Sequence, residues 1–568
     1  FELMTFLCCV SLILFGILNI IVECKQPNII YILADDLGYD DVGFQSNEIN
    51  TPNIDKLRHE GQFIPWYYAQ TVCSPSRSAL LSGQYPMHNG VWDVLTPDQS
   101  VSLPLHYKLL PEFLLENGYE THMIGKWHLG YYKWSATPTF RGFQSFYGYY
   151  TGAEDYYNHY NGHYDFHDDR GLNCGVNCSE IAIDAYNKYS TYLFTSRAIE
   201  IIKNHSTNVT TKDKPLFMYL PFQAVHNPDQ VPLKYVWEYN NTIQNYTRRY
   251  FAGMLSCLDE GIGNITSVLN EYGYMDNNTI IIFASDNGGP VPEWVGGATG
   301  SSNYPLRGGK MSVFEGGVRV TATFWATPDI VDIKYRDTQY TQLMHTSDWF
   351  LTLIEAAGIN INNLGLNYSL DSVSQWNGLI HNNDNNIIDP YFNFRNTVYY
   401  GWNMSPKFTI DAIRVGWYKL INGTYGGYPT GWYPPPPGPL NSKYNINFGK
   451  YGSYKDCDTN YMSSNDTCSG GEYYYFNTIN NNGINHYDYY NSINKSQFML
   501  FNLSDDPNEH INVVNDIQYN DIFNITFQAL INIEKTRNPE ISNDINCPNQ
   551  TFPEFPVVGT VLLPWCGC

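Results

Sequence analysis

A reactive thiol and a fixed positive charge share one turn of a predicted helix in the run Cys73-Ser74-Pro75-Ser76-Arg77. Proline is tolerated in a first helical turn, and the pattern that follows ends at Gly83, a usual helix stop. Cys73 therefore begins the helix, where free backbone N–H groups and the macrodipole favour negative charge. The guanidinium of Arg77 lies near the same face, four residues on. The run predicts an anion site beside a reactive atom; half of a disulfide or a buried thiol is the simpler alternative.

Two acidic pairs each follow an apolar, β-branched run that predicts a buried strand of a parallel sheet. Asp35 and Asp36 follow residues 28–34, and Asp286 and Asn287 follow residues 279–285. Because ligands gather outside the carboxyl ends of strands in open α/β sheets, both pairs should reach the same edge. Their oxygens suit a hard divalent cation, calcium before magnesium if the site is roomy. A solvated turn is the alternative for either pair alone.

Further cationic and imidazole side chains follow predicted strands or lie in glycine-rich loops. Lys126 and His128 follow a short strand at residues 121–124, and His226 follows a strand at residues 215–221. Lys310 lies in a loop rich in glycine. Each of these residues alone is as readily an ordinary surface or core residue, so their meaning depends on the other motifs.

Taken together, these motifs resemble the type I, formylglycine-dependent sulfatases, whose Cys-x-Pro-Ser-Arg signature carries a cysteine that is oxidised in the endoplasmic reticulum. The resemblance runs from Pro27 to about Gly358, continues more thinly beyond, and favours the arylsulfatase B (N-acetylgalactosamine-4-sulfatase) subgroup. It implies an α/β, alkaline-phosphatase-like sandwich with a large, mostly parallel sheet flanked by helices. A smaller C-terminal domain with an antiparallel sheet and a helix would follow.

The resemblance implies hydrolysis of sulfate esters, on sulfated sugars or aryl sulfates. Formylglycine formed from Cys73 would be hydrated to a gem-diol; one oxygen would attack sulfur, and the other would expel sulfate by restoring the aldehyde. His128 would take the diol proton, and His226 would bind sulfate and assist the leaving oxygen. Charge on the transferring group would be offset by Arg77, Lys126 and Lys310. One Ca²⁺ per chain, with Mg²⁺ possible, would be held by Asp35, Asp36, residue 73, Asp286 and Asn287.

The subgroup implies a terminal N-acetylgalactosamine 4-sulfate as substrate and a formylglycine-generating enzyme as partner during maturation. The net charge of −23 argues against a nucleic-acid partner and would repel a long polyanion, so we expect exo-action with an acidic optimum. Two alternatives remain open. One is a metal-dependent phospho- or phosphonate-ester hydrolase on the same scaffold, and the other is a catalytically inactive secreted glycoprotein.

At 568 residues the chain is too long for one core, so two domains are expected. We predict a signal peptide at 1–24, a catalytic domain at 25–390 and a C-terminal subdomain at 391–568 with a Tyr/Asn/Pro-rich insertion at about 425–494. An uncleaved N-terminal membrane anchor is the alternative to the signal peptide. Helices are expected at 109–117, 195–205, 246–271, 342–357 and 517–534, and late antiparallel strands at 397–400, 412–415 with 417–421, and 499–503.

Fifteen Asn-x-Ser/Thr sequons favour passage through the secretory pathway, to a lysosome or the extracellular space, although the high asparagine content lowers their weight. In such an oxidising compartment Cys174–Cys178 and Cys457–Cys468 are plausible local disulfides. Cys257 lies in an apolar helical pattern and is predicted to be a buried thiol. The pairing of Cys547, Cys566 and Cys568 stays open.

Overall fold

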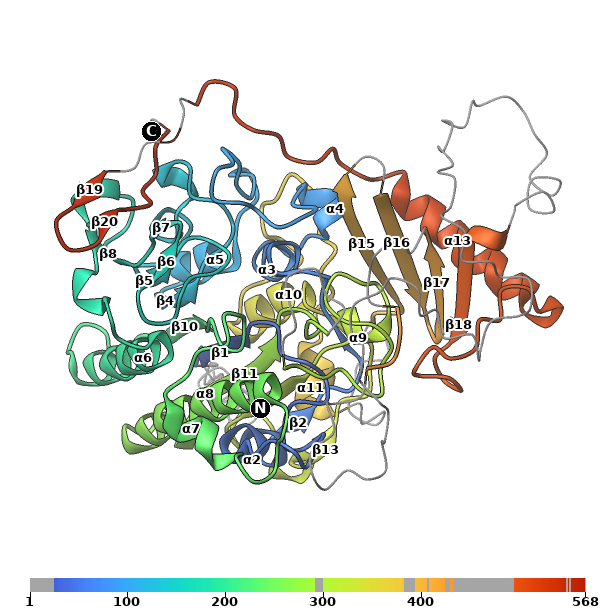
Figure 1. Cartoon of the computed structure of the whole chain (residues 1–568), viewed down its shortest axis with the longest axis horizontal. Coiled ribbons are helices and arrows are strands. Elements are labelled where there is room, and N and C mark those ends of the chain that lie inside the picture. The colour runs from blue at the N-terminus through green and yellow to red at the C-terminus, as the bar shows by residue number, and fades with distance from the viewer. Residues whose placement is uncertain are drawn as a thin grey trace, which may run out of the picture.

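The computed structural model describes residues 25–291, 300–382, 394–405, 408–423, 430–433, 495–547, 550 and 553–566. The predicted signal peptide, most of the predicted insertion, the predicted Cys457–Cys468 bridge and Cys568 lie outside these residues. The predicted domain boundary near residue 390 also lies outside them and stays a prediction. Figure 1 shows a large sheet with its helices on one side of the molecule and a smaller sheet with one helix on the other.

Five parallel strands form the centre of a ten-stranded sheet and confirm the predicted fold class. Side chains of the central strand alternate between two hydrophobic cores, so that Ile30 and Ile32 face one core while Ile29 and Tyr31 face the other. Burial on both faces explains the unbroken apolar run. In sheet order the parallel strands are β11 (Thr279–Ser285), β1 (Asn28–Ala34), β10 (Leu216–Pro221), β4 (Glu120–Lys126) and β5 (Ser145–Tyr149).

Short strands extend this sheet at both edges. Those beyond β11 are β12 (Ala322–Ala326), β2 (Gln62–Phe63) and β13 (Thr338–Gln339), and those beyond β5 are β8 (His167–Arg170) and β9 (Ser179–Ile181). The pairs β11–β12, β12–β2, β5–β8 and β8–β9 are antiparallel, so the sheet is mixed at its edges and parallel at its centre.

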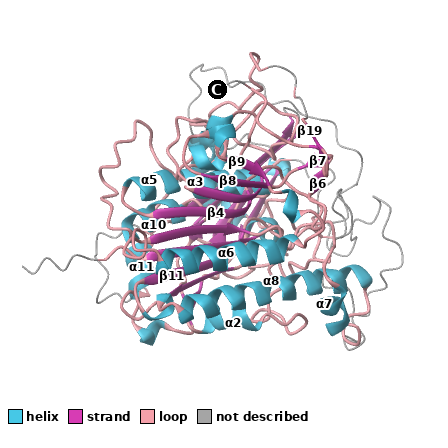
Figure 2. Cartoon of the chain, turned by 90° about the vertical axis from the view of Figure 1, so that its left-hand side faces the viewer, coloured by secondary structure: helices cyan, strands magenta, loops and turns pink. Residues whose placement is uncertain are grey.

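Helices cover both faces of the large sheet (Figure 2). One face carries α2 (Pro52–His59), α6 (Ser190–Thr207), α7 (Leu233–Glu238) and α8 (Tyr246–Glu271). The other face carries α3 (Cys73–Ser82), α5 (Leu110–Glu116), α10 (Asp348–Ala356) and α11 (Trp376–His381). The short helices α4 (Pro86–Asn89) and α9 (Glu315–Val318) lie in connecting segments.

One helix expected from the sequence is shorter than predicted. Residues 342–347 do not join α10, because β14 (Met344–His345) pairs in parallel with β3 (Tyr67–Tyr68). The Asp348 carboxylate accepts a hydrogen bond from the backbone N–H of His345 at 2.9 Å, which fixes the turn into the helix. The spacing of apolar residues at 342–347 therefore predicted a helix, whereas these residues contain a strand that pairs with β3.

The smaller sheet and its helix confirm the C-terminal prediction. Four antiparallel strands lie in the order β15 (Thr397–Ser405), β16 (Phe408–Val415), β17 (Tyr418–Asn422) and β18 (Phe498–Asn502). Helix α13 (Asn520–Glu534) packs Phe523 and Phe527 against this sheet. The chain then returns across the large sheet (Figure 1), where β19 (Glu554–Phe555) and β20 (Gly559–Thr560) lie near β6 (Tyr160–Asn161) and β7 (His163–Tyr164).

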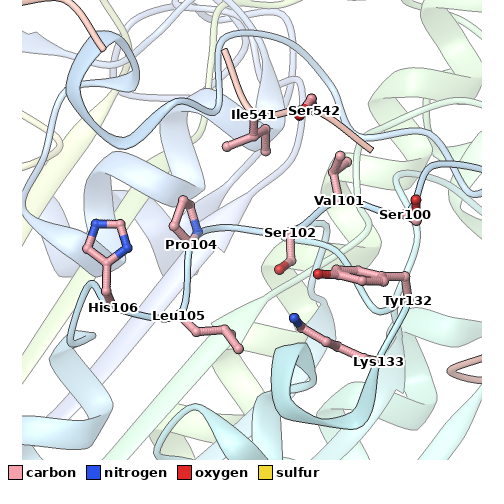
Figure 3. A pocket seen from close by; sticks show the side chains of 10 residues that line it. All are labelled: Ser100, Val101, Ser102, Pro104, Leu105, His106, Tyr132, Lys133, Ile541 and Ser542. Atoms are coloured by element: carbon pink, nitrogen blue, oxygen red, sulfur yellow. The ribbon is translucent and has the colours of Figure 1, made fainter. Parts of the chain in front are cut away.

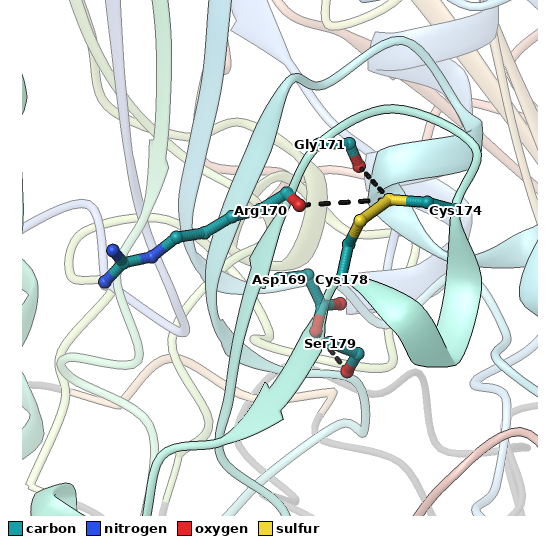
Figure 4. Close-up of a disulfide and its surroundings, with 6 residues drawn as sticks. All are labelled: Asp169, Arg170, Gly171, Cys174, Cys178 and Ser179. Carbon is teal, nitrogen blue, oxygen red and sulfur yellow. Dashed lines mark hydrogen bonds between the residues drawn. A yellow bond between two sulfur atoms is a disulfide. The ribbon is translucent and has the colours of Figure 1, made fainter.

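The predicted bridge between Cys174 and Cys178 is present and closes the loop before β9 (Figure 4). Cys257 is a buried free thiol in α8, as predicted. Cys547 and Cys566 are also free. Within the described ranges, no helix is both long and apolar enough to cross a membrane.

Candidate active site

The two acidic pairs meet at one edge of the large sheet, because β1 and β11 are parallel neighbours whose carboxyl ends lie side by side. Asp36 adopts a left-handed backbone conformation, with φ of 62°, directly after β1. Its backbone N–H donates to Asp286 Oδ1 at 3.2 Å, and Asn287 Nδ2 donates to Asp36 Oδ1 at 2.7 Å. The structure thus brings together the four oxygen-bearing side chains that the sequence singles out.

Helix α3 delivers the thiol to this edge. It begins at Cys73 and ends at Gly83, whose φ of 68° provides the left-handed stop, and all ten of its residues are buried. Cys73 Sγ lies 3.6 Å from Asp35 Oδ1. Potential ligand atoms of Asp35, Asp36, Cys73 and His226 all lie within 4.8 Å of one another. The sequence did not place His226 among the metal-binding atoms; its order along the chain gives no signal for that proximity.

Three buried cations balance the three buried carboxylates. All six side chains are at most 5% exposed, so the site concentrates charge in a region that excludes water. The charges cancel only as a set, and a bound divalent cation would give the site a positive excess that favours an anionic substrate. The closest pairs are Arg77 with Asp286 at 2.8 Å, Lys126 with Asp35 at 2.6 Å and Lys310 with Asp36 at 2.8 Å.

The surroundings of these buried groups shift their pKa values in opposite directions. Burial raises the pKa of the Cys73 thiol to about 12, so the encoded side chain is protonated at neutral pH. Burial, together with the charge of Asp35, raises the pKa of Asp286 to about 6. Burial also acts to raise the pKa of Asp36, but the positive charge of Lys310 and its neighbours outweighs it and holds the value at about 2.

His128 presents one free ring nitrogen. Its Nε2 lies 3.1 Å from the carbonyl oxygen of Leu95, and since a carbonyl only accepts, we assign the proton of the neutral ring to Nε2. Nδ1 is then the acceptor, and it is buried without a hydrogen-bond partner among the described residues. Burial and the positive charges of Lys126 and Arg77 lower the pKa of His128 well below its usual value.

Two residues that the sequence did not single out hold His128 in place. Ser74 Oγ donates to the carbonyl of His128 at 2.8 Å and accepts from the backbone N–H of Leu95 at 3.2 Å. Gly152 packs directly on the imidazole, so a Cβ at that position would lie 2.6 Å from the ring. Ser74 stood in the quoted run without a role, and Gly152 has no local sequence signal, because its neighbour is 24 residues away in the chain.

His226 is oriented in a similar way. Its Nδ1 lies 2.6 Å from the backbone carbonyl of Asn227, which assigns a proton to that nitrogen. Nε2 then faces Asp36 Oδ2 at 3.6 Å. Burial lowers the pKa of His226 to about 3, although the charge of Asp36 opposes this shift.

A family model described as Sulfatase matches residues 27–359, which is more than half of the chain. The chain belongs to the sulfatase family. This result agrees with the position of the thiol, the acidic pairs and the cations, all of which lie within the matched residues.

Similar sulfatases include arylsulfatase J of Mus musculus, 40% identical over 432 residues that cover 72% of this chain and 66% of the relative. N-acetylgalactosamine-6-sulfatase of Homo sapiens is 30% identical over 353 residues, covering 59% of this chain and 63% of the relative. The chain thus spans just under two thirds of the length of these curated relatives. The crystal structure of Ps i-CgsB in complex with k-i-k-neocarrahexaose superposes with a TM-score of 0.67 at 23% identity, covering 93% of this chain and 96% of that one. This likeness shows the alkaline-phosphatase-like sulfatase fold.

Sulfatases use a formylglycine and a divalent metal, and the site fits such a cation. The side-chain oxygen of Asn287 is buried without a hydrogen-bond partner among the described residues, although a buried amide oxygen normally has one. Its amide nitrogen is already engaged by Asp36, so the oxygen is directed elsewhere. Carboxylate and amide oxygens form the ligand set that Ca²⁺ and Mg²⁺ prefer.

Proposed function

We propose that this sulfatase hydrolyses sulfate esters on sulfated sugars, with residue 73 converted to formylglycine. The observation that carries the proposal is the buried cluster around Cys73, which combines three cations and three carboxylates with two acceptors, His128 Nδ1 and Asn287 Oδ1, that have no hydrogen-bond partner in the described part of the chain. A thiol whose pKa is raised to about 12 is a poor nucleophile as encoded, which agrees with a modified side chain at this position.

We assign the metal to Asp35, Asp36, Asp286 and Asn287 together with residue 73. When bound, the cation would polarise the ester oxygens and favour ionisation of the attacking group, and formylglycine would supply a hydrated-aldehyde oxygen as nucleophile. Calcium is proposed before magnesium, and metal analysis of the purified protein decides between them.

The cations of the site act on the transferring group. Arg77, Lys126 and Lys310 are held rigidly by carboxylates, so they meet the developing negative charge without reorganising. The backbone N–H groups at the start of α3 add positive potential beside residue 73. Rigid donors in a dry site are the arrangement that stabilises charge most strongly.

The two histidines would accept and donate protons in the proposed reaction. We propose that His128 accepts the proton of the attacking oxygen at Nδ1, because Nε2 is engaged by the carbonyl of Leu95. His226 binds the sulfate group and assists the leaving oxygen through Nε2. The neighbouring carboxylate of Asp36, at 3.6 Å, opposes the lowering of the His226 pKa by burial.

The substrate that we propose is a terminal N-acetylgalactosamine 4-sulfate. The enzyme would remove the sulfate by exo-action at acidic pH. It would act on the secretory route, in a lysosome or in the extracellular space. The 30% identity to the human 6-sulfatase favours a 6-sulfated sugar as the second candidate. Maturation would require a formylglycine-generating enzyme.

The test measures sulfate released from an aryl sulfate and from 4-sulfated and 6-sulfated N-acetylgalactosamine oligosaccharides at acidic and neutral pH. We expect release from the 4-sulfate above the 6-sulfate and none from a Cys73→Ala control. A preference for the 6-sulfate would contradict the arylsulfatase B subgroup but would not contradict the sulfatase activity. Phosphate release from an aryl phosphate without sulfate release would favour a phosphoester hydrolase, and no turnover of either would favour an inactive glycoprotein.

A further inference from the structure

A pocket of about 380 Å³ lies between the segment 100–106, the residue pair Tyr132 and Lys133, and the returning C-terminal tail (Figure 3). Ile541 and Ser542 of that tail form one wall. The tail is fixed there by backbone hydrogen bonds from Ile541 to Gly90 and from Asp544 to Ser100. The volume lies near the lower end of the ~300–1,000 Å³ found for small-ligand sites.

Three polar groups point into the same space in Figure 3: the hydroxyls of Ser102 and Tyr132 and the ammonium of Lys133. Ser102 is 9% exposed and Tyr132 is 6% exposed, so both are largely buried. The ammonium lies 4.8 Å from the centroid of the Tyr132 ring, which orients it. Two hydroxyl donors beside one cation form a set that suits an anion.

Apart from the contact between Lys133 and the Tyr132 ring, these groups have no polar partner in the described part of the chain. Among the residues that the structure describes, no side chain or backbone group hydrogen-bonds to Ser102 Oγ or to the Tyr132 hydroxyl, and no carboxylate pairs with Lys133. The residues that line the pocket include no aspartate or glutamate. The two hydroxyl oxygens are open to the pocket, so a ligand there takes the place of water.

The pocket adjoins the segment that carries the proposed base. The backbone N–H of Leu103 donates to the carbonyl of Leu129 at 3.0 Å, directly after His128. Gly130 packs so tightly on this wall that a Cβ there would lie 2.3 Å from the carbonyl oxygen of Val101. The wall of the pocket at residues 101–103 is therefore in contact with the segment that carries His128.

We propose that this pocket binds a sulfate or carboxylate group on a second sugar unit of the substrate. The inference rests on the proposed function, since it takes the substrate to be a sulfated oligosaccharide. Lys133 would supply the charge and the two hydroxyls would supply oriented hydrogen bonds. A local cation of this kind offsets the repulsion between an acidic protein and an anionic sugar chain.

The test compares KM for a chondroitin 4-sulfate tetrasaccharide with KM for a small aryl sulfate that cannot reach the pocket. We expect Lys133→Ala to raise the ratio of the two KM values on the order of ten-fold, the effect of losing one hydrogen bond to a charged group. Tyr132→Phe keeps the ring and should raise the ratio less. Lys133→Arg should retain most of the wild-type ratio, and Lys203→Ala, an exposed lysine on α6, serves as the matched control.

A binding arm separates this inference from the proposed function. Calorimetric titration of the tetrasaccharide into Cys73→Ala protein, with and without Lys133→Ala, reports the pocket without turnover. Weaker binding in the double variant supports the subsite even if sulfate release fails. Equal binding, or an equal loss of activity on both substrates, overturns it. Inorganic sulfate is titrated in parallel, and Lys133-dependent binding of sulfate alone would assign the pocket to the free ion and contradict a sugar-borne group.

Discussion

Buried charge serves two different ends in this molecule, at the catalytic edge and beneath the smaller sheet. Beneath that sheet, Lys419 lies between the carboxyl groups of Glu315 and Glu509, 2.9 Å from each, and all three side chains are fully buried. In this cluster, the Lys419 triad, Glu315 also accepts from the hydroxyl of Tyr68 at 2.7 Å, whereas Glu509 Oε1 is held by its ion pair with Lys419 and has no hydrogen-bond partner among the described residues. The catalytic edge instead leaves two acceptors, Asn287 Oδ1 and His128 Nδ1, without partners among the described residues. Charge that is paired within the protein holds the fold together, whereas acceptors with neither a hydrogen bond nor an ion pair among the described residues mark where a ligand is expected.

The two regions are also connected. Glu509 accepts a hydrogen bond from the backbone N–H of Glu315 at 2.7 Å, and its own carbonyl accepts from Arg307 at 3.2 Å. Arg307 and Glu315 flank the loop that carries Lys310 into the site. The smaller sheet therefore supports the loop of Lys310, one of the three cations proposed to act in catalysis, which predicts that damage to the triad affects both stability and activity.

The largest effect is expected from removing the cation of the triad. Lys419→Ala leaves the buried carboxyl group of Glu509 without its ion pair and leaves Glu315 paired with Arg319 at 3.9 Å, which should cost about 3–5 kcal/mol in free energy of unfolding. Denaturant unfolding measures this directly. The control is Lys234→Ala, which breaks an exposed pair with Glu260 and should cost less than about 1 kcal/mol. Similar losses in the two variants would remove the distinction between the regions.

A nearly equal energy should appear in catalysis when Lys310 is lost. Lys310→Ala removes one rigid cation from the transferring group, and we expect kcat/KM to fall by a factor on the order of 10²–10³. Its free energy of unfolding should fall by less than that of Lys419→Ala, because the buried Asp36 keeps the positive charge of Lys126 nearby. A stability loss as large as the one expected for Lys419→Ala, with activity retained, would contradict the assignment.

A smaller catalytic effect is expected from crowding His128. A Cβ at Gly152 would lie 2.6 Å from the imidazole, so Gly152→Ala should displace the ring and lower kcat by at least about ten-fold, a part of the ~10²–10⁴ attributed to general acid–base groups. KM should change little if the ring acts on the proton and not on substrate binding. Ser74→Ala should act in the same direction, and Ser74→Thr, which keeps the hydroxyl, should restore activity. Failure of that rescue would point to a structural role alone.

The smallest effect expected is a pH dependence of stability. Burial and the charge of Glu315 raise the pKa of Glu509 to about 7, against an ordinary value of about 4.3. Between these two values the folded state binds more protons than the unfolded state, so the free energy of unfolding falls as pH rises from about 4 to about 7. Glu509→Gln cannot titrate and should flatten that slope. Thermal unfolding across this window measures the difference, and identical slopes would refute the assignment.

The sequence predicted the elements whose signal is local. Residues 28–34 and 279–285 are continuous apolar runs, and parallel pairing then placed Asp36 and Asp286 together. The helix at Cys73 followed from Pro75 and the stop at Gly83.

Features built from distant residues were not predictable in the same way. Lys419 meets Glu315 across 104 residues, and the pocket at Lys133 is closed by residues 541–542 of the returning tail. The helix expected from residue 342 failed for a related reason, because the strand that Met344 joins is supplied by Tyr67. The local spacing of apolar residues and the local helix propensity carry no information on such long-range pairings.

The central claim concerns the chemistry at residue 73, and mass spectrometry of the peptide that contains it is the most direct test. Protein produced with a formylglycine-generating enzyme should show formylglycine at this position, and the rate of sulfate release should rise in proportion to the modified fraction. Protein produced without that enzyme should carry cysteine and lack activity, although it folds equally well. Full sulfatase activity from protein that carries only unmodified Cys73 would contradict the account.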